Sequence, residues 1–219
     1  ETGGLNVADE HMSTAIAIRV MSRVYAESLE RVRRPGRIML AAADAFAQRG
    51  FHATTTRDIA SRAGLSPAGV YVHFTSKEVL LFELSRRGHE RARDLLVEAA
   101  AAADSPTEAL RAIIGGFSRW HAEHYELGRI VQFEFRHLRQ EHRDAVLGLR
   151  KEIDQVVAGV LRDGVDTGEF AVTDVPATAL ALLSMAIDVA RWYTPDVRRT
   201  PTAIEATYGE LAVRLVHSG

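Results

Sequence analysis

Apolar residues recur at intervals of three and four along most of the chain, a pattern that predicts α-helices nearly throughout. One such stripe covers residues 36–49 and ends at Gly50. Further stripes run through residues 146–161 and 202–217, and the segment 176–193 is apolar nearly all round, which implies burial on more than one face. No stretch of strand length alternates apolar and polar residues, so the predicted fold class is all-α.

Two short helices with clear start signals follow the first stripe. Thr55 is placed to cap the helix "TRDIASRA", and Asp58 three positions later supports that cap. Gly64 ends this helix, and Ser66 with Pro67 begins the next one, since proline is tolerated in the first turn. Two short helices joined in this way form a helix-turn-helix, whose second helix enters the major groove of DNA.

The front of the second helix carries almost no side-chain bulk. Ala68 and Gly69 occupy it, which lets the helix backbone approach a DNA duplex closely. Val70 and Phe74, four residues apart, are the expected buried anchors of this helix. Val72 could touch a thymine methyl group.

The stretch "ATTTRDIASRAGLSPAGVYVHFTSKEVLL" resembles the DNA-binding signature of TetR-type transcriptional regulators, and the match covers about residues 36–82. The resemblance implies a dimeric, all-helical, cytoplasmic bacterial regulator, by family default a repressor, that binds double-stranded operator DNA. Its C-terminal domain would bind a small molecule that loosens the grip on DNA. The residues assigned to DNA binding are Thr55, Thr56, Arg57, Ser66, Pro67, Ala68, Gly69, Tyr71, Val72, His73 and Lys77.

Some of these residues also have a plainer interpretation. Thr55 and Thr56 could act only as helix caps, although a cap and a phosphate contact are compatible. Tyr71 and His73 could lie at the rim of the core, and Lys77 could be an ordinary exposed lysine instead of a phosphate contact.

Charge is distributed unevenly along the chain. Residues 19–93 hold 14 Lys and Arg against 7 Asp and Glu, whereas residues 94–219 hold 13 against 19. A basic N-terminal third of net charge +7 suits a polyanionic partner. The predicted division is therefore an N-terminal extension over 1–34, a helix-turn-helix domain over 35–83 and a ligand-binding and dimerisation domain over 84–219.

The ligand is expected to be small and hydrophobic. The C-terminal part is diffusely similar to family members that control fatty-acid and steroid breakdown, which sense acyl-CoA thioesters. An acyl chain would need apolar walls and a CoA head group would need cations. The candidate ligand contacts are Trp120, Phe133, Arg136, Met185 and Trp192, with Arg139 and Arg143 as further cations, while the aromatic members could instead be plain core residues.

The last two helices are expected to pair with their copies in a four-helix dimer interface, as the resemblance implies. The alternative is an unusually thick monomer core. The candidate interface residues are Leu182, Val189, Tyr208, Leu211 and Leu215.

A second functional class is an enzyme, in the form of a metal-dependent hydrolase domain fused to the helix-turn-helix. His121 and His124, three apart, suit metal ligation in geometry. However, no accompanying acidic motif or nucleophile–base set is present, so no metal, cofactor or enzymatic activity is predicted. The chain has no cysteine, which excludes disulfides, and neither a signal peptide nor a membrane span is expected.

Overall fold

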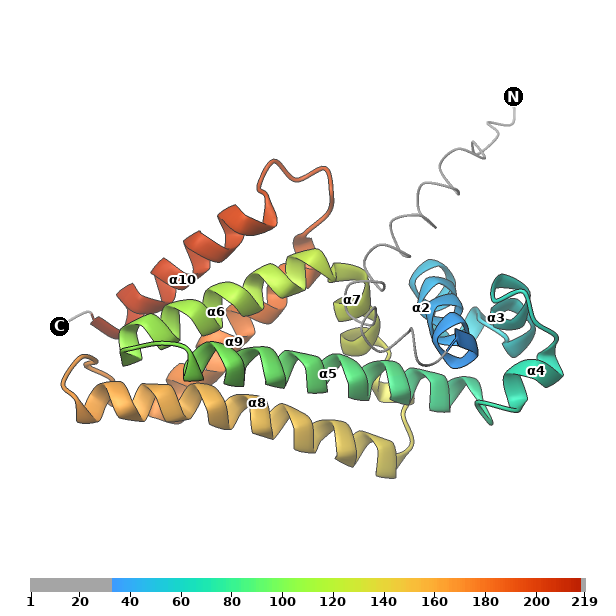
Figure 1. Ribbon diagram of the computed structural model, residues 1–219, viewed down its shortest axis with the longest axis horizontal. Helices are drawn as coiled ribbons and strands as arrows, with labels where there is room; N and C mark the ends of the chain where they lie inside the picture. Colours follow the sequence, from blue (N-terminus) through green and yellow to red (C-terminus); the bar gives the residue numbers. More distant parts are fainter. Residues whose placement is uncertain (1–32, 218–219) are drawn as a thin grey trace. The chain divides into compact units, whose positions relative to one another are not determined.

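The computed structural model describes residues 33–217, and all regular elements in that range are helical (Figure 1). The predicted all-α fold class is confirmed, whereas the predicted N-terminal extension falls almost entirely outside the described residues. The helices are α2 (Arg33–Ala53), α3 (Thr56–Arg62), α4 (Pro67–Tyr71), α5 (Lys77–Ala101), α6 (Pro106–Glu123), α7 (Tyr125–Phe133), the 3-10 turn η1 (Phe135–His137), α8 (Gln140–Asp166), α9 (Val175–Trp192) and α10 (Pro201–His217).

The chain divides into two compact units. The first runs to Leu84 and also includes Ile130–Arg139, and the second contains Ser85–Arg129 together with the chain from Gln140 onward. The sequence predicted a single domain boundary between residues 83 and 84. That prediction did not include the segment Ile130–Arg139, which folds with the helix-turn-helix. Helices α5 and α7 each run through a boundary between the units.

The first unit packs α3 against both α2 and α4. Ile38 and Phe46 of α2, Ile59 of α3 and Val70 of α4 are almost completely inaccessible to solvent. Burying a large apolar side chain stabilises a fold by about 1.5–3 kcal/mol. This small core therefore fixes the orientation of two helices that are too short to be stable alone.

The second unit is organised around α6, which packs against α8, α9 and α10. Its closest approach is to α10, where glycines replace side chains at both contact points. A Cβ atom on Gly115 would lie 2.7 Å from the carbonyl oxygen of Glu205, and one on Gly209 would lie 2.7 Å from that of Arg111. The two backbones can approach this closely only because neither glycine has a side chain.

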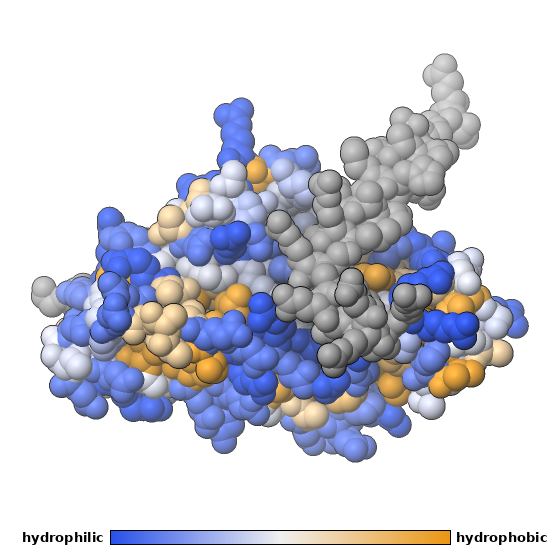
Figure 2. Space-filling view, viewed as in Figure 1, coloured by the Kyte–Doolittle hydropathy of each residue, from blue (hydrophilic) through white to orange (hydrophobic). Residues whose placement is uncertain are grey.

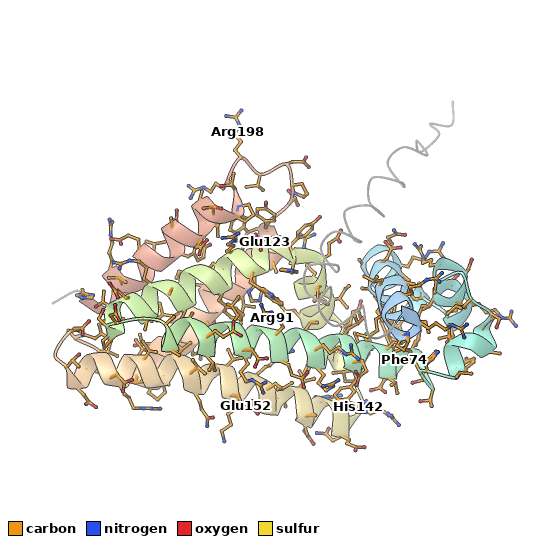
Figure 3. All side chains as sticks on the ribbon, viewed as in Figure 1. Phe74, Arg91, Glu123, His142, Glu152 and Arg198 are labelled. Atoms are coloured by element: carbon orange, nitrogen blue, oxygen red, sulfur yellow. The ribbon has the colours of Figure 1, made fainter. Side chains whose placement is uncertain are left out.

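Ion pairs link neighbouring helices of the second unit. Arg93 of α5 donates to Glu152 of α8 at 2.8 Å, and Glu152 is labelled in Figure 3. Arg119 of α6 reaches both Glu123, also labelled there, and Glu205 of α10, each at 3.0 Å. These side chains are partly solvent-exposed, so each pair contributes little to stability, with about 0–1 kcal/mol typical.

Helix α9 has 18 residues and a mean hydropathy of 1.3, a length and composition that would also suit a membrane-crossing helix. The sequence has no unbroken apolar run of that length, so no membrane span was predicted here. A third of it is buried within the protomer, and core helices of globular proteins often have this composition. Asp188 and Arg191 form an ion pair at 2.6 Å near its C-terminal end.

Candidate DNA-binding surface and regulatory domain

The start of α3 is fixed by a reciprocal cap. The Thr55 side chain accepts a hydrogen bond from the Asp58 backbone N–H at 3.2 Å, and the Asp58 carboxylate accepts one from the Thr55 N–H at 2.8 Å. Hydrogen bonds from the Thr55 side chain and backbone are the main causes that lower the pKa of Asp58. This confirms the predicted capping box and leaves Thr55, Thr56 and Arg57 at the N-terminal end of the helix.

Helix α4 begins as the sequence predicts. Ser66 accepts a hydrogen bond from the Gly69 N–H at 3.1 Å, and Pro67 occupies the first turn. Val70 and Phe74 are buried, so they are confirmed as the anchors of this element. Figure 3 labels Phe74 in the turn between α4 and α5.

The opposite face of α4 is open to solvent. Val72 is 79% exposed, Tyr71 and His73 are also exposed, and Ala68 presents only a methyl group. The surface shown in Figure 2 is otherwise largely hydrophilic, with apolar side chains in separate patches. The predicted DNA-reading residues in α4 and directly after it are therefore accessible to solvent, and their contact with DNA stays a prediction.

Lys77 occupies a different environment from the predicted one. Its ammonium donates to three backbone carbonyls, those of Phe51 at 2.6 Å, His52 at 3.2 Å and Thr54 at 2.9 Å. An ammonium has three protons, so these bonds use its full donor capacity. We therefore correct the assignment of Lys77 from phosphate contact to a cap that joins the start of α5 to the end of α2.

Two family models match the chain and together cover most of the described residues. Residues 38–84 match the model described as bacterial regulatory proteins, tetR family, and residues 103–216 match the tetracyclin repressor-like C-terminal domain. The second match alone covers more than half of the chain. The chain belongs to the TetR family.

Individual relatives agree with this assignment. The chain is 32% identical over 170 residues to the HTH-type transcriptional repressor KstR2 of Rhodococcus jostii (strain RHA1). This alignment covers 76% of this chain and 83% of that protein. A bacterial regulatory protein in the tetR family from Rhodococcus RHA1 superposes with a TM-score of 0.79 at 34% identity, covering 84% of this chain and 96% of that one. The ketosteroid transcriptional regulator KstR2 of Mycobacterium tuberculosis superposes with a TM-score of 0.76 at 26% identity, covering 85% and 96%.

The predicted ligand contacts of this TetR-family chain are divided between the two units. Phe133, which is 57% exposed, and Arg136 belong to the first unit, whereas Trp120, Met185 and Trp192 belong to the second. The five residues are therefore not brought together within one compact unit. Sequence order could not predict this division, because it depends on where the segment Ile130–Arg139 packs.

The two tryptophans have well-defined packing partners. Trp120 is buried and stacks on His124 with ring centroids 4.9 Å apart. Trp192 packs with Tyr208 against a core cluster that contains Val189 and Ile204. The environment of Trp192 agrees with the plainer interpretation of a core aromatic residue.

His121 and His124 are buried in the second unit, and His89, which had no predicted role, is partly buried there. Each ring places Nδ1 close to the carbonyl oxygen four residues earlier: 2.7 Å for His89, 2.9 Å for His121 and 2.8 Å for His124. Burial lowers the pKa of both His89 and His121 to about 4, so these two rings are neutral at pH 7. The Nε2 atom of His89 in turn accepts a hydrogen bond from Arg150 of α8 at 3.1 Å.

The metal-hydrolase alternative gains no support from this arrangement. Within residues 33–217, no group of three or more His, Cys, Asp or Glu side chains is placed to hold a metal ion. His121 and His124 both place Nδ1 close to a helix carbonyl oxygen.

The predicted interface residues separate into two groups. Leu182 and Val189 are fully buried within the protomer, so they offer no surface to a partner, and we correct their assignment to core residues. Tyr208 is partly buried, whereas Leu211 and Leu215 of α10 are exposed, Leu215 by 60%. Leu180 of α9, which was not among the predicted interface residues, is 64% exposed.

Proposed function

We propose that this protein is a ligand-responsive transcriptional repressor that works in the cytoplasm and binds a near-palindromic operator as a homodimer. A small hydrophobic effector, with an acyl-CoA as the leading candidate, would release it from DNA. The observation that carries this proposal is the capped and internally anchored α4, whose opposite face is exposed in a chain of the TetR family. The relatives named as KstR2 repressors support repression as the direction of control.

The proposed DNA contacts lie at the starts of α3 and α4 and along the exposed face of α4. Backbone N–H groups at a helix start suit phosphate oxygens, as do the hydroxyl groups of Thr55 and Thr56. Arg57 adds a cation, and Tyr71, Val72 and His73 are available for base edges. Ser66, Pro67, Ala68 and Gly69 complete the proposed surface by letting the backbone of α4 approach the groove floor.

The proposed dimer would use the exposed leucines of the last two helices. Leu180, Leu211 and Leu215 are large apolar side chains that are partly exposed in the protomer, and a second copy would cover them. Dimerisation also suits DNA reading, because two recognition helices then contact two successive major grooves.

The proposed effector site is in the second unit, with Trp120 of α6 and Met185 of α9 as contacts of an acyl group and Arg143 of α8 as a contact of the CoA phosphates. A protein with the same fold supports this chemistry. The regulator FadR of Bacillus subtilis in complex with stearoyl-CoA superposes with a TM-score of 0.70 at 23% identity, covering 83% of this chain and 98% of that one. An effector that prefers the DNA-free form must weaken operator binding by the same coupling factor.

Fluorescence anisotropy with a duplex from the region upstream of the protein's own gene tests DNA binding. We expect specific, strongly salt-dependent binding. A Val72→Glu variant should lose binding, because it places a carboxylate on the exposed face of α4 without disturbing the core. Val97→Glu changes another exposed valine, in the second unit, and serves as the matched control that retains binding.

The effector is tested by titrating the operator complex with stearoyl-CoA, stearic acid and CoA alone. Release by the thioester at lower concentration than by the free acid supports the proposed site. Equal release by acid and thioester would contradict a role for the phosphates, and no release by any of the three would exclude this effector class while leaving DNA binding intact.

A further inference from the structure

The last turn of α2, directly before the link to α3, is held at both ends by charged side chains. Helix α2 is interrupted at Gly50, whose φ of 74° is not helical, and its last turn covers Phe51–Ala53. The Phe51 N–H donates to Glu134 Oε1 at 3.2 Å. At the other end of the turn, the Lys77 ammonium donates to the backbone carbonyls described above. The shortest of these hydrogen bonds, to the carbonyl oxygen of Phe51, measures 2.6 Å.

The charges match the direction of the backbone groups that they contact. A carboxylate lies where the turn exposes an N–H group, and an ammonium lies where it exposes carbonyl groups, which is the favourable arrangement for a helical dipole. We call the segment Phe51–Thr54, together with Glu134 and Lys77, the charged clamp. Hydrogen bonds in which one partner is ionised are shorter and stronger than neutral ones.

His137 adds an aromatic contact to the same turn. Its ring stacks on Phe51 with centroids 5.1 Å apart and an interplanar angle of 8°, and it meets the ring of His52 edge-on at 4.2 Å. Its Nε2 atom lies 3.2 Å from Glu134 Oε2 and 3.3 Å from Arg136 Nε. The Nε2 atom accepts the hydrogen bond from Arg136, and burial lowers the pKa of His137, which favours the neutral ring beside the Glu134 carboxylate.

The charged clamp is directly continuous with the proposed DNA surface. Thr54 is fully buried, and its hydroxyl donates to the carbonyls of Ala45 and Gly50 at 3.0 and 2.8 Å. The next residue is Thr55, the cap of α3. Any change in the orientation of the turn is therefore passed on, through one rigidly bonded residue, to the helix start that we propose to contact phosphate.

Glu134 and His137 lie in a segment that the family match assigns to one domain and the packing assigns to the other. They lie within residues 103–216, which match the family's C-terminal domain, yet Ile130–Arg139 folds with the helix-turn-helix as part of the first unit. The segment also follows directly from α7, whose first residues belong to the second unit. We propose that Glu134 and His137 are positioning residues for DNA binding, which orient α3 and α4 through the charged clamp although neither touches DNA.

This inference rests on the proposed DNA-binding function. The test compares operator affinity in three variants, each measured well below its own melting temperature so that loss of fold does not contribute. Glu134→Ala removes the acceptor for the Phe51 N–H, Glu134→Gln keeps an acceptor there but removes the charge, and His137→Phe keeps the stacked ring but removes the contact with Glu134. Glu141→Ala, which removes an exposed carboxylate at the start of α8, is the matched control.

We expect Glu134→Ala to weaken specific operator binding by about tenfold or more, with Glu134→Gln recovering part of the loss, while Glu141→Ala leaves the affinity unchanged. Binding to non-specific duplex should change much less, because charge and not orientation dominates it.

If folded Glu134→Ala, Glu134→Gln and His137→Phe all bind the operator as tightly as the wild type, the positioning role is wrong although DNA binding stands. If the wild type itself does not bind duplex DNA, the proposed function fails instead. If Glu134→Ala does not fold, the operator affinities of Glu134→Gln and His137→Phe decide the question. Wild-type affinity in both of these variants would contradict the positioning role.

Discussion

The Lys77 ammonium lies 4.4 Å from the centre of the Phe51 ring and 2.6 Å from the carbonyl oxygen of the same residue. The cation therefore interacts with both the aromatic face and the backbone of one residue, 26 positions earlier in the chain. This contact gives a TetR-type signature residue a structural role within the DNA-binding unit, and the first prediction depends on it.

Replacing Lys77 with Met should destabilise the first unit. The substitution keeps most of the side-chain length but removes the three hydrogen bonds from an ionised donor, each of which typically contributes about 1.5–3 kcal/mol. We expect a lower melting temperature by circular dichroism and an unchanged slope of log affinity against log salt concentration. An unchanged melting temperature with a slope reduced by about one would instead show that Lys77 contacts a phosphate.

Replacing Gly69 with Leu should abolish specific DNA binding and leave the fold intact. A Cβ atom at this position would meet only Ser66 Oγ at 3.5 Å and Leu65 Cβ at 3.7 Å, which are ordinary contacts. The added bulk would then separate the helix from the groove floor. A folded Gly69→Leu protein that gives a normal operator footprint would show that this end of α4 does not face DNA.

Replacing Gly209 with Ala should destabilise the second unit, because the new methyl group would lie 2.7 Å from the Arg111 carbonyl and would force α6 and α10 apart. We expect a loss of about 1–3 kcal/mol in the free energy of unfolding, measured by urea titration. Gly148→Ala is the matched control, since a Cβ atom there has no neighbour within 4 Å. That helical substitution should stabilise the protein by up to about 1 kcal/mol, and equal effects of the two substitutions would contradict the tight helix crossing.

Replacing Leu211 with Glu should dissociate the proposed dimer without unfolding the protomer. Leu211 is 40% exposed in the protomer, so a carboxylate there is tolerated in a monomer but costly when a second copy covers it. Light scattering at micromolar concentration would show the change in mass, and Val165→Glu, at an exposed valine of α8, is the control that keeps the dimer. A wild-type protein that is already monomeric under these conditions removes the four-helix interface from the proposal.

The stability of the second unit should fall as the pH decreases from about 6.5 towards 4. Burial lowers the folded-state pKa of His89 and His121 to about 4 from an ordinary value of 6.5, so the unfolded chain binds protons first on acidification. The stabilising contribution is therefore complete above about pH 6.5 and is lost as the pH falls through that window, by an amount on the order of 3 kcal/mol per histidine. Urea titrations at pH 7 and pH 4.5 measure it. His121→Phe should show a smaller difference between the two pH values, and an unchanged difference would contradict the buried neutral ring.

Local signals in the sequence determined most of the helix-turn-helix. The caps at Thr55 and Ser66 bond to backbone groups three positions away, and the anchors Val70 and Phe74 are recognised by their spacing of four, so these local signals predict the structure directly. The all-α class followed in the same way from apolar spacing of three and four. These features need no knowledge of which distant segments meet.

Only the tertiary structure decided the roles that depend on distant segments. Helix α9 is apolar nearly all round, so its periodicity could not show that Leu182 and Val189 face the protomer's own core while Leu180 faces outward. Lys77 carries the same charge whether it meets a phosphate or a carbonyl, and only the position of the end of α2 selects between them. Glu134 lies 83 residues from its partner Phe51, and the packing that brings them together has no periodic or capping signature in the sequence.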